Sequence, residues 1–307
     1  MVMPDVIEIC EVGPRDGLQA NPRIFSVDER IEMIERLSDS GIRKIEAVSF
    51  VNPKRVPQMA NAEEVLAGLR KRDGVAYAGL ALNRRGAERA LEAGVSEIRF
   101  AVLATETFNQ RNQGVSVAQS IADFSDTAKV AAGGGIGTTA VVSAAFGCPF
   151  EGTVSSETAI DLAMRLIDAG ARQVIFADTI GCAVPTQVRG VLCGLKGRLR
   201  NALPLGVHLH NTRNTGFANA VAAIESGATV IDASIGGLGG CPFAPDATGN
   251  IATEDLAHML RNMGIDTGMD LDALIGTVGW LEGLFGHNLP GQLARAKPFP
   301  ECATAAA

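Results

Sequence analysis

The chain has 307 residues, of which 47% are hydrophobic, and it carries a formal net charge of −7 at pH 7. This length is large for an ordinary domain but normal for a single α/β barrel, and it allows a large buried core. Basic runs interleaved with aromatic residues do not occur, which argues against a nucleic-acid partner. An anionic small substrate would therefore need local positive charge from a metal ion, an arginine or a helix N-terminus.

The cysteines indicate a reducing compartment. The six of them form no CxxC pair and show no spacing typical of a disulfide framework. The first residues include no cationic segment followed by an apolar stretch, and no run is long and apolar enough to span a membrane. We therefore expect a cytoplasmic protein without a signal peptide and without a membrane partner.

Short apolar runs alternate with helical patterns from one end of the chain to the other. Glycine closes several helices directly before the next strand, at Gly41, Gly94, Gly170 and Gly227. This alternation predicts an α/β fold, specifically a (β/α)₈ TIM barrel. A doubly wound open sheet is the alternative, but no GxGxxG follows the first strand. The strands are expected at Val6–Val12, Lys44–Ser49, Ala76–Ala81, Glu97–Leu103, Thr138–Ala144, Gln173–Asp178, Gly206–His210 and Thr229–Ser234.

The helices predicted between these strands are Val27–Ser40, Ala62–Arg72, Arg84–Ala93, Val117–Ala132, Ser156–Ala169, Pro185–Arg200 and Thr215–Ser226. One more helix is expected from about Thr253, and an additional C-terminal helix, roughly Leu271–Phe285, lies outside the eightfold count. No Pro/Ser-rich linker occurs, so we predict one domain spanning residues 1–307, with a disordered tail at 298–307.

Two of the four histidines, His208 and His210, stand one residue apart at the end of a predicted strand. Residues i and i+2 of a strand project from the same face, so both imidazoles can reach one metal ion. Two surface histidines at a strand end are the simpler alternative. The pair becomes a site only if other segments supply oxygen ligands.

Active-site groups of a TIM barrel lie at the carboxyl ends of the strands and in the loops that follow them. Reading those positions along the chain gives a short set of polar residues and one thiol: Arg15, Asp16, Glu46, Ser49, Asp178, His208, His210, Cys241 and Asn250. Polar groups at the ends of five strands are hard to explain as packing alone.

Each of these residues also has a structural alternative. Glu46 and Asp178 could be buried carboxylates in ion pairs, with Arg15 as a partner. Asn250 could cap the helix that begins near Thr253. Among the remaining candidates, Cys148, Cys182 and Cys193 are expected to pack as small apolar groups, and His258 and His287 to be surface or core histidines.

The segment Glu11-Val-Gly-Pro-Arg-Asp-Gly-Leu-Gln19 resembles 3-hydroxy-3-methylglutaryl-CoA lyase, of the metal-dependent TIM-barrel lyase and Claisen-condensing superfamily. The likeness covers nearly the whole chain in order. It continues through Ile45–Pro53, Thr105–Asn109, Phe146–Gly152, Asp178–Gly181, His208–His210, Gly237–Pro242 and Gly249–Asp255.

The resemblance implies a divalent metal, Mg²⁺ or Mn²⁺, held by Asp16, His208, His210 and Asn250. This mixed set of nitrogen and oxygen donors also suits those ions on chemical grounds. The resemblance further implies that Arg15 contacts substrate oxygens, that Glu46 supports the residues that hold the metal and that Cys241 is a catalytic thiol. We assign Ser49 and Asp178, with Arg15, to substrate binding.

The implied reaction is the retro-Claisen cleavage of 3-hydroxy-3-methylglutaryl-CoA to acetyl-CoA and acetoacetate, a step of leucine degradation. Either His208 or Asp16 would act as the base. Asn211 stands where the most similar lyases have Asp, and the segment before Asp178 is apolar, so we expect tolerance for a C3 substituent other than methyl.

Three alternatives remain at this point: a lyase for citramalyl-CoA or a bulkier glutaryl-CoA analogue, a synthase that condenses acetyl-CoA with a 2-oxo acid, and a catalytically silent binding protein. The expected partners are an acyl-CoA thioester and further copies of the chain, with a dimer favoured.

Overall fold

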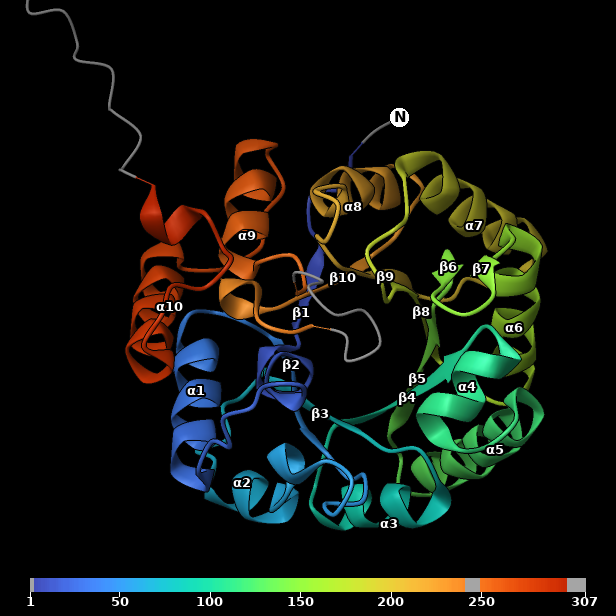
Figure 1. Ribbon diagram of the computed structural model, residues 1–307, viewed down its shortest axis with the longest axis horizontal. Coiled ribbons are helices and arrows are strands. Elements are labelled where there is room, and N and C mark those ends of the chain that lie inside the picture. The colour runs from blue at the N-terminus through green and yellow to red at the C-terminus, as the bar shows by residue number, and fades with distance from the viewer. Residues whose placement is uncertain (1–2, 241–248, 297–307) are drawn as a thin grey trace, which may run out of the picture.

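The computed structural model describes residues 3–240 and 249–296 and contains a closed barrel of eight parallel strands (Figure 1). The strands pair in the order β1-β10-β9-β8-β5-β4-β3-β2. This closure confirms the predicted TIM barrel and excludes the open sheet. The barrel strands are β1 (Glu8–Glu11), β2 (Lys44–Ser49), β3 (Ala76–Leu80), β4 (Glu97–Leu103), β5 (Gly137–Ser143), β8 (Gln173–Asp178), β9 (Leu205–Leu209) and β10 (Val230–Ala233).

The predicted helices form a ring around the barrel (Figure 1). They are α1 (Val27–Asp39), α2 (Ala62–Gly68), α3 (Arg84–Glu92), α5 (Val117–Gly133), α6 (Ser156–Asp168), α7 (Pro185–Arg198), α8 (Gly216–Glu225) and α9 (Thr253–Asn262). The prediction for α2 was too long, because Leu69 adopts an extended backbone and ends the helix. The predicted extra helix, α10 (Leu271–Phe285), lies outside the ring against α1 and α9. The predicted tail at 298–307 lies outside the described residues.

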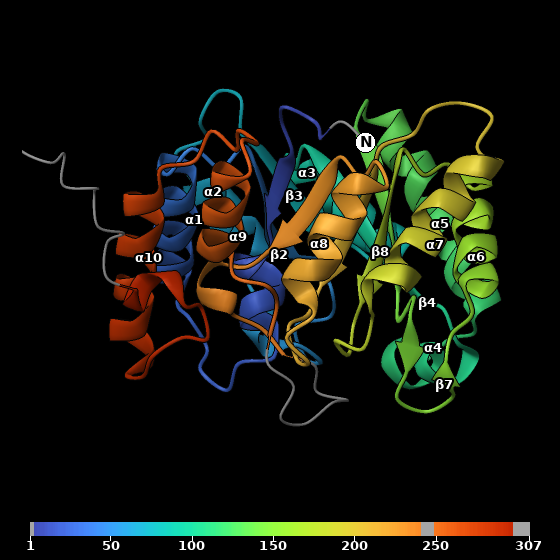
Figure 2. The same ribbon diagram turned by 90° about the horizontal axis from the view of Figure 1, so that it is seen from above.

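Several short elements were not predicted. They are the π-helical turn η1 (Gly13–Gly17), helix α4 (Glu106–Gln113), the hairpin β6 (Gly147–Cys148) and β7 (Gly152–Thr153), and the 3₁₀ turns η2 (Pro57–Met59), η3 (Ile235–Gly237) and η4 (Leu293–Arg295). Helix α4 has the sequence ETFNQRNQ, in which Phe108 is the only apolar residue. The helix was not predicted because the sequence has no apolar periodicity. Helix α4 and β7 extend beyond one end of the barrel (Figure 2). No helix in the described part of the chain is both long and apolar enough to cross a bilayer.

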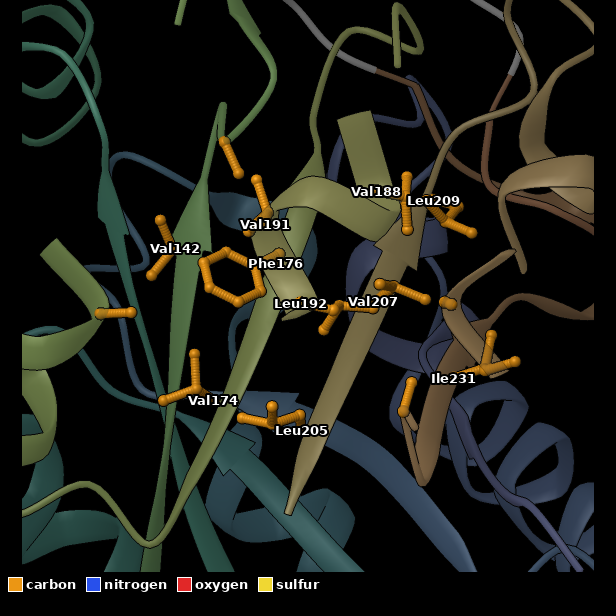
Figure 3. Packing of buried hydrophobic residues seen from close by; sticks show 14 of the residues in the cluster. Val142, Val174, Phe176, Val188, Val191, Leu192, Leu205, Val207, Leu209 and Ile231 are labelled. Atoms are coloured by element: carbon orange, nitrogen blue, oxygen red, sulfur yellow. The ribbon is translucent and has the colours of Figure 1, made fainter. Parts of the chain in front are cut away.

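Strand alternation divides the side chains between two environments. Val174 and Phe176 of β8 and Val207 of β9 are fully buried and face helix α7, whose Val188 and Leu192 pack against them (Figure 3). The residues between them in sequence face the barrel interior instead. Position 208 is therefore directed inward because its neighbours at 207 and 209 are anchored outward by hydrophobic burial.

Two buried carboxylates connect the strand ends to the turns that carry the site. Glu11, at the end of β1, accepts hydrogen bonds from Gly13 N at 2.6 Å, Ile235 N at 3.0 Å and Thr253 Oγ1 at 2.6 Å. Glu254 of α9 accepts one from Gly236 N at 2.9 Å. Burial raises the pKa of Glu11 to about 7 and that of Glu254 to about 8.

These two carboxyl groups predict that the protein loses stability as the pH rises from about 4.5 to 8. The unfolded chain releases both protons near its ordinary value of 4.5, whereas the folded state retains them, so the free energy of unfolding falls across that window. Urea unfolding at several pH values measures this slope. Glu11→Gln and Glu254→Gln should each flatten it, and the exposed Glu88→Gln should not. An unchanged slope in the double variant would contradict the prediction.

Candidate active site

The π-helical turn η1 places Arg15 and Asp16 at the carboxyl end of β1. The amides of Arg15, Asp16 and Gly17 all donate to Val12 O, at 3.2, 2.7 and 3.2 Å. Pro14 fits because it lacks the amide hydrogen that the first turn would leave without a partner. Turns of this kind recur at functional sites because they redirect consecutive side chains. Here both the guanidinium and the carboxylate line the central cavity.

The two histidines meet as the strand register predicts. His208 lies inside β9 and His210 directly after it, and both are more than nine-tenths buried. Their Nε2 atoms are 3.2 Å apart, and His208 Nε2 is 3.8 Å from Asp16 Oδ2. One ligand atom from each of Asp16, His208 and His210 lies within 4.8 Å of the others. These three side chains can therefore coordinate one ion.

Asn250 joins this group through its amide. Its Nδ2 donates to Asp16 Oδ2 at 2.9 Å and to Leu238 O at 3.0 Å. Its Oδ1 is buried and has no hydrogen-bond partner within the described part of the chain, so an acceptor atom is available for a cation. Helix α9 begins at Thr253 with Ala252 as its N-cap, so the alternative that Asn250 caps this helix was wrong.

A glycine allows the close approach to Asn250. Gly239 has a φ of +124°, and a Cβ there would lie 2.6 Å from Asn250 Nδ2. Any other residue at 239 would displace the amide from Asp16. The set of two imidazoles, one carboxylate and one amide oxygen suits Mg²⁺ or Mn²⁺ with water completing the coordination sphere. The residues present therefore fit the implied metal.

Glu46 is completely buried and pairs with two arginines. Its Oε2 accepts from Arg15 Nη2 at 2.6 Å and lies 3.7 Å from Arg99 Nη1. Arg15 also donates from Nη1 to Asp16 Oδ1 at 2.8 Å. The ion-pair alternative for Glu46 thus describes its contacts correctly, and the pair stands inside the site.

Charges in the cavity separate the pKa values of neighbouring groups. Burial opposes ionisation of Asp16, but Arg15 and the two imidazoles outweigh it and hold the pKa of Asp16 below its usual range. Burial, with the neighbouring His208, lowers the pKa of His210 to about 4. His210 is therefore neutral at physiological pH, the form that binds a metal.

The predicted roles of Ser49, Asp178 and Cys241 are not confirmed by the structure. Neither Ser49 nor Asp178 is among the described residues that line the cavity. The carboxylate of Asp178 accepts from Cys182 N at 2.8 Å and Ala183 N at 3.0 Å, which orders the loop after β8. Their role in substrate binding stays a prediction. Cys241 lies outside the described residues; the preceding Gly240 lines the cavity.

The remaining histidines and cysteines behave mostly as expected. His258 and His287 are exposed, and Cys148 is buried. Cys182 is half-buried. Cys193 is exposed on α7, so its expected packing role was wrong. The cause is its position on the outer face of a helix whose inner face already contains Val188, Val191, Leu192 and Leu195.

The cavity has a volume of about 900 Å³ and two chemically different walls. Charged groups and imidazoles gather at the ends of β1, β9 and β10. The opposite wall, from β3 to β5 and α4, combines the apolar residues Leu80, Leu82, Leu103, Phe108 and Val115 with polar ones, among them Asn83, Arg99 and Gln113.

Asp232 and Arg99 line the cavity and were not predicted as site residues. Asp232 of β10 has its Oδ2 at 3.2 Å from His208 Nδ1, and Arg99 of β4 donates from Nη2 to the same oxygen at 2.6 Å. A charged residue in the middle of an apolar strand was the available signal in both cases. Neither residue stands at the carboxyl end of its predicted strand, where site residues of a barrel are expected.

A polar cluster at the carboxyl ends of the strands of a TIM barrel defines the class of protein as a TIM-barrel enzyme. The HMGL-like family model matches residues 6–278. The (R)-citramalyl-CoA lyase of Chloroflexus aurantiacus is 41% identical over 304 residues, which cover 96% of each chain.

Two solved structures are similarly close. The HMG-CoA lyase of Bacillus subtilis has a TM-score of 0.93 and 40% identity, with 96% of this chain and 99% of the other covered. An HMG-CoA lyase of Acinetobacter baumannii in complex with coenzyme A and 3-methylmalate has a TM-score of 0.91 and 41% identity, with 96% and 98% covered. The chain therefore belongs to the HMGL-like family and is a carbon–carbon lyase, as the sequence motifs predicted.

The convergence of ligand atoms predicts that Mn²⁺ or Mg²⁺ added to metal-free protein raises its Tm in a concentration-dependent manner. His210→Ala removes one of the clustered nitrogens and should abolish most of this increase. His258→Ala, which changes an exposed histidine on α9, should retain it. Differential scanning fluorimetry with and without EDTA measures the effect. Equal behaviour of the two variants would show that the wrong histidines were chosen.

Proposed function

We propose that the chain is a divalent-metal-dependent acyl-CoA lyase that cleaves 3-hydroxy-3-methylglutaryl-CoA to acetyl-CoA and acetoacetate, as in leucine degradation. The observation that carries the proposal is the convergence of Asp16, His208 and His210 beside Arg15 in one cavity, with Asn250 hydrogen-bonded to Asp16. The names of the similar lyases support the substrate class.

Each residue of the site is assigned a role in the reaction. Asp16, His208, His210 and Asn250 would hold Mg²⁺ or Mn²⁺, which would supply the positive charge that lowers the pKa of the substrate hydroxyl. His208 or Asp16 takes the hydroxyl proton. Arg15 stabilises the negative charge that develops on oxygen as the C–C bond breaks. Glu46 orients the Arg15 guanidinium through their 2.6 Å contact.

The cavity suits a thioester of coenzyme A. Its volume is in the range of small-molecule and cofactor sites. Arg55, exposed on the loop after β2, lines the outer part of the cavity and supplies a cation for phosphate groups. The net charge of −7 makes such a local cation necessary for an anionic substrate.

A lyase for citramalyl-CoA is the second candidate. The Chloroflexus relative bears that name, and the Acinetobacter structure holds coenzyme A with 3-methylmalate. Lyase relatives disfavour the condensing synthase and the silent binding protein. We further propose that the enzyme is cytoplasmic, in keeping with cysteines that lack disulfide-like spacing, and that it assembles as a homodimer, which light scattering would test.

We predict that the enzyme accepts a substituent larger than methyl at C3, because the wall formed by Leu80, Leu82 and Leu103 is apolar. The measurement is kcat/KM for citramalyl-CoA, 3-hydroxy-3-methylglutaryl-CoA and longer 3-alkyl analogues, with products identified by mass spectrometry. EDTA should abolish every activity and Mg²⁺ or Mn²⁺ should restore it. Full turnover by metal-free enzyme would end the proposed mechanism, and strict selectivity for methyl would refute the larger substituent.

Cys241 is proposed as the acid that protonates the carbon of the acetyl-CoA enolate. A thiol with an ordinary pKa of about 8.5 is a suitable donor near neutral pH, whereas a serine hydroxyl is far weaker. Cys241→Ser should therefore lower kcat by about 10²- to 10⁴-fold with little change in KM. Cys148→Ser is the control and should leave kcat nearly intact in folded protein. A near-normal kcat for Cys241→Ser would leave the enolate without its donor.

A further inference from the structure

Arg99 crosses the interior of the barrel. It projects from β4, and its Nη2 donates to Asp232 Oδ2 on β10 at 2.6 Å. In the closed strand order, β4 and β10 are separated by β9, β8 and β5, so they stand on opposite sides of an eight-stranded ring. The side chain is 2% exposed, and both it and Asp232 line the cavity.

Each carboxylate beside Arg99 touches a different part of the candidate active site. Asp232 Oδ2 lies 3.2 Å from Nδ1 of His208, the nitrogen on the far side of the ring from Nε2. Glu46 Oε2 lies 3.7 Å from Arg99 Nη1 and accepts from Arg15 Nη2 at 2.6 Å.

These contacts close a ring in which acidic and basic side chains alternate. From Arg99 it runs through Asp232 to His208, and through Glu46 to Arg15. Arg15 and His208 then meet again at Asp16, at 2.8 and 3.8 Å. Arg99 is the member of the ring that joins both buried carboxylates.

We propose that Arg99 is a positioning residue that holds His208 through Asp232, and Arg15 through Glu46, in the orientation that binds the metal and the substrate. This inference rests on the proposed metal-dependent function. Arg99 itself contacts neither His208 nor Arg15 by any hydrogen bond or ion pair found among the described residues. It acts through the two carboxylates.

The physical reason is the cost of leaving a buried carboxylate without its cation. Asp232 and Glu46 are 1% and 0% exposed, so neither can turn to water if Arg99 is lost. Each would reorient toward its other cation, and the imidazole and guanidinium would move with it. A planar guanidinium can hold two carboxylates at a fixed angle, which an ammonium cannot do. Mutation of a group that orients a metal-ligating histidine through its other ring nitrogen typically weakens metal binding by about 10- to 100-fold.

The barrel provides a matched comparison in Lys44. It is also a buried cation in the barrel interior, paired with Glu97 at 2.7 Å and with Gln173 Oε1 at 3.0 Å. None of these three residues lines the cavity or contacts a proposed metal ligand. Replacing Lys44 should therefore lower the stability of the fold, as the loss of any buried cation would, without changing metal binding.

The experiment compares the Kd for Mn²⁺ in metal-free wild type, Arg99→Met and Lys44→Met by isothermal titration calorimetry, with urea unfolding to measure stability. Both variants should be destabilised. Only Arg99→Met should bind Mn²⁺ about 10- to 100-fold more weakly, with Lys44→Met within about twofold of wild type. Equal Kd values in the two variants would overturn the proposal. A wild type that binds no Mn²⁺ would refute the metal site itself, and this inference with it.

Two further variants test the route. A double-mutant cycle compares Arg99→Met, Asp232→Asn and the variant that carries both changes. The fold-loss of Mn²⁺ affinity in the double variant should be smaller than the product of the two single losses. Independent effects would show that Arg99 does not act through Asp232. If Arg99→Met does not fold, Arg99→Lys carries the test. A lysine keeps one ion pair and loses the other, so metal binding should still weaken by several-fold, and an unchanged Kd would refute the role of the guanidinium.

Discussion

Pairing of charges inside the barrel is the constraint on which the site depends. Glu46, Asp232 and Arg99 are almost completely buried, and an isolated charge in such a position would cost several kcal/mol. None of them is isolated, because Arg99 lies between the two carboxylates and Arg15 joins Glu46 to Asp16. The proposed ligand His208 and the neighbouring Arg15 are thus held in place by ion pairs and hydrogen bonds to the two buried carboxylates. The cavity side of the same groups remains available to a cation and a substrate.

The barrel makes this arrangement possible by separating apolar from polar side chains along each strand. Val207 and Leu209 are held outward by packing against the helices, which leaves His208 inside (Figure 3). The register then places Asp232 of β10 directly beside His208 of β9. Strand β4 supplies the opposing cation from across the barrel. Hydrophobic burial on the outer face and ion pairing on the inner face therefore specify the same strand orientation.

The limits of helices and strands could be predicted from the sequence where the apolar pattern and its end signals lie close together in the chain. Strands β2, β4 and β8 and helix α10 have the predicted limits, because their apolar runs are bounded by clear turn or cap signals. The clustering of Asp16 with His208 and His210 also followed from the motifs and the barrel rule. Helix α4 was missed because the residues that hold it, such as Asn109 with its contact to Ser120 at 2.8 Å, are polar and have no helical periodicity. Arg99 and Asp232 were missed for a different reason: their partnership spans 133 positions and exists only in the closed barrel.

Under the proposed function, the substituent at C3 of the substrate would face the wall that carries Leu80, Leu82 and Leu103. The charged half of the cavity would then bind the hydroxyl and carboxylate oxygens near the bond that breaks. The half formed by Leu80, Leu82, Leu103, Phe108 and Val115 addresses the rest of the acyl group, and apolar walls of this kind discriminate by only about 1–3 kcal/mol per methylene. The substrates in the names of similar proteins, citramalyl-CoA and 3-hydroxy-3-methylglutaryl-CoA, share the methyl group and the tertiary hydroxyl and differ by one methylene between that carbon and the free carboxylate. Changes in the leucines of this wall would therefore act on the substituent at C3 and leave the ring of acidic and basic side chains, and with it the proposed chemistry, unchanged.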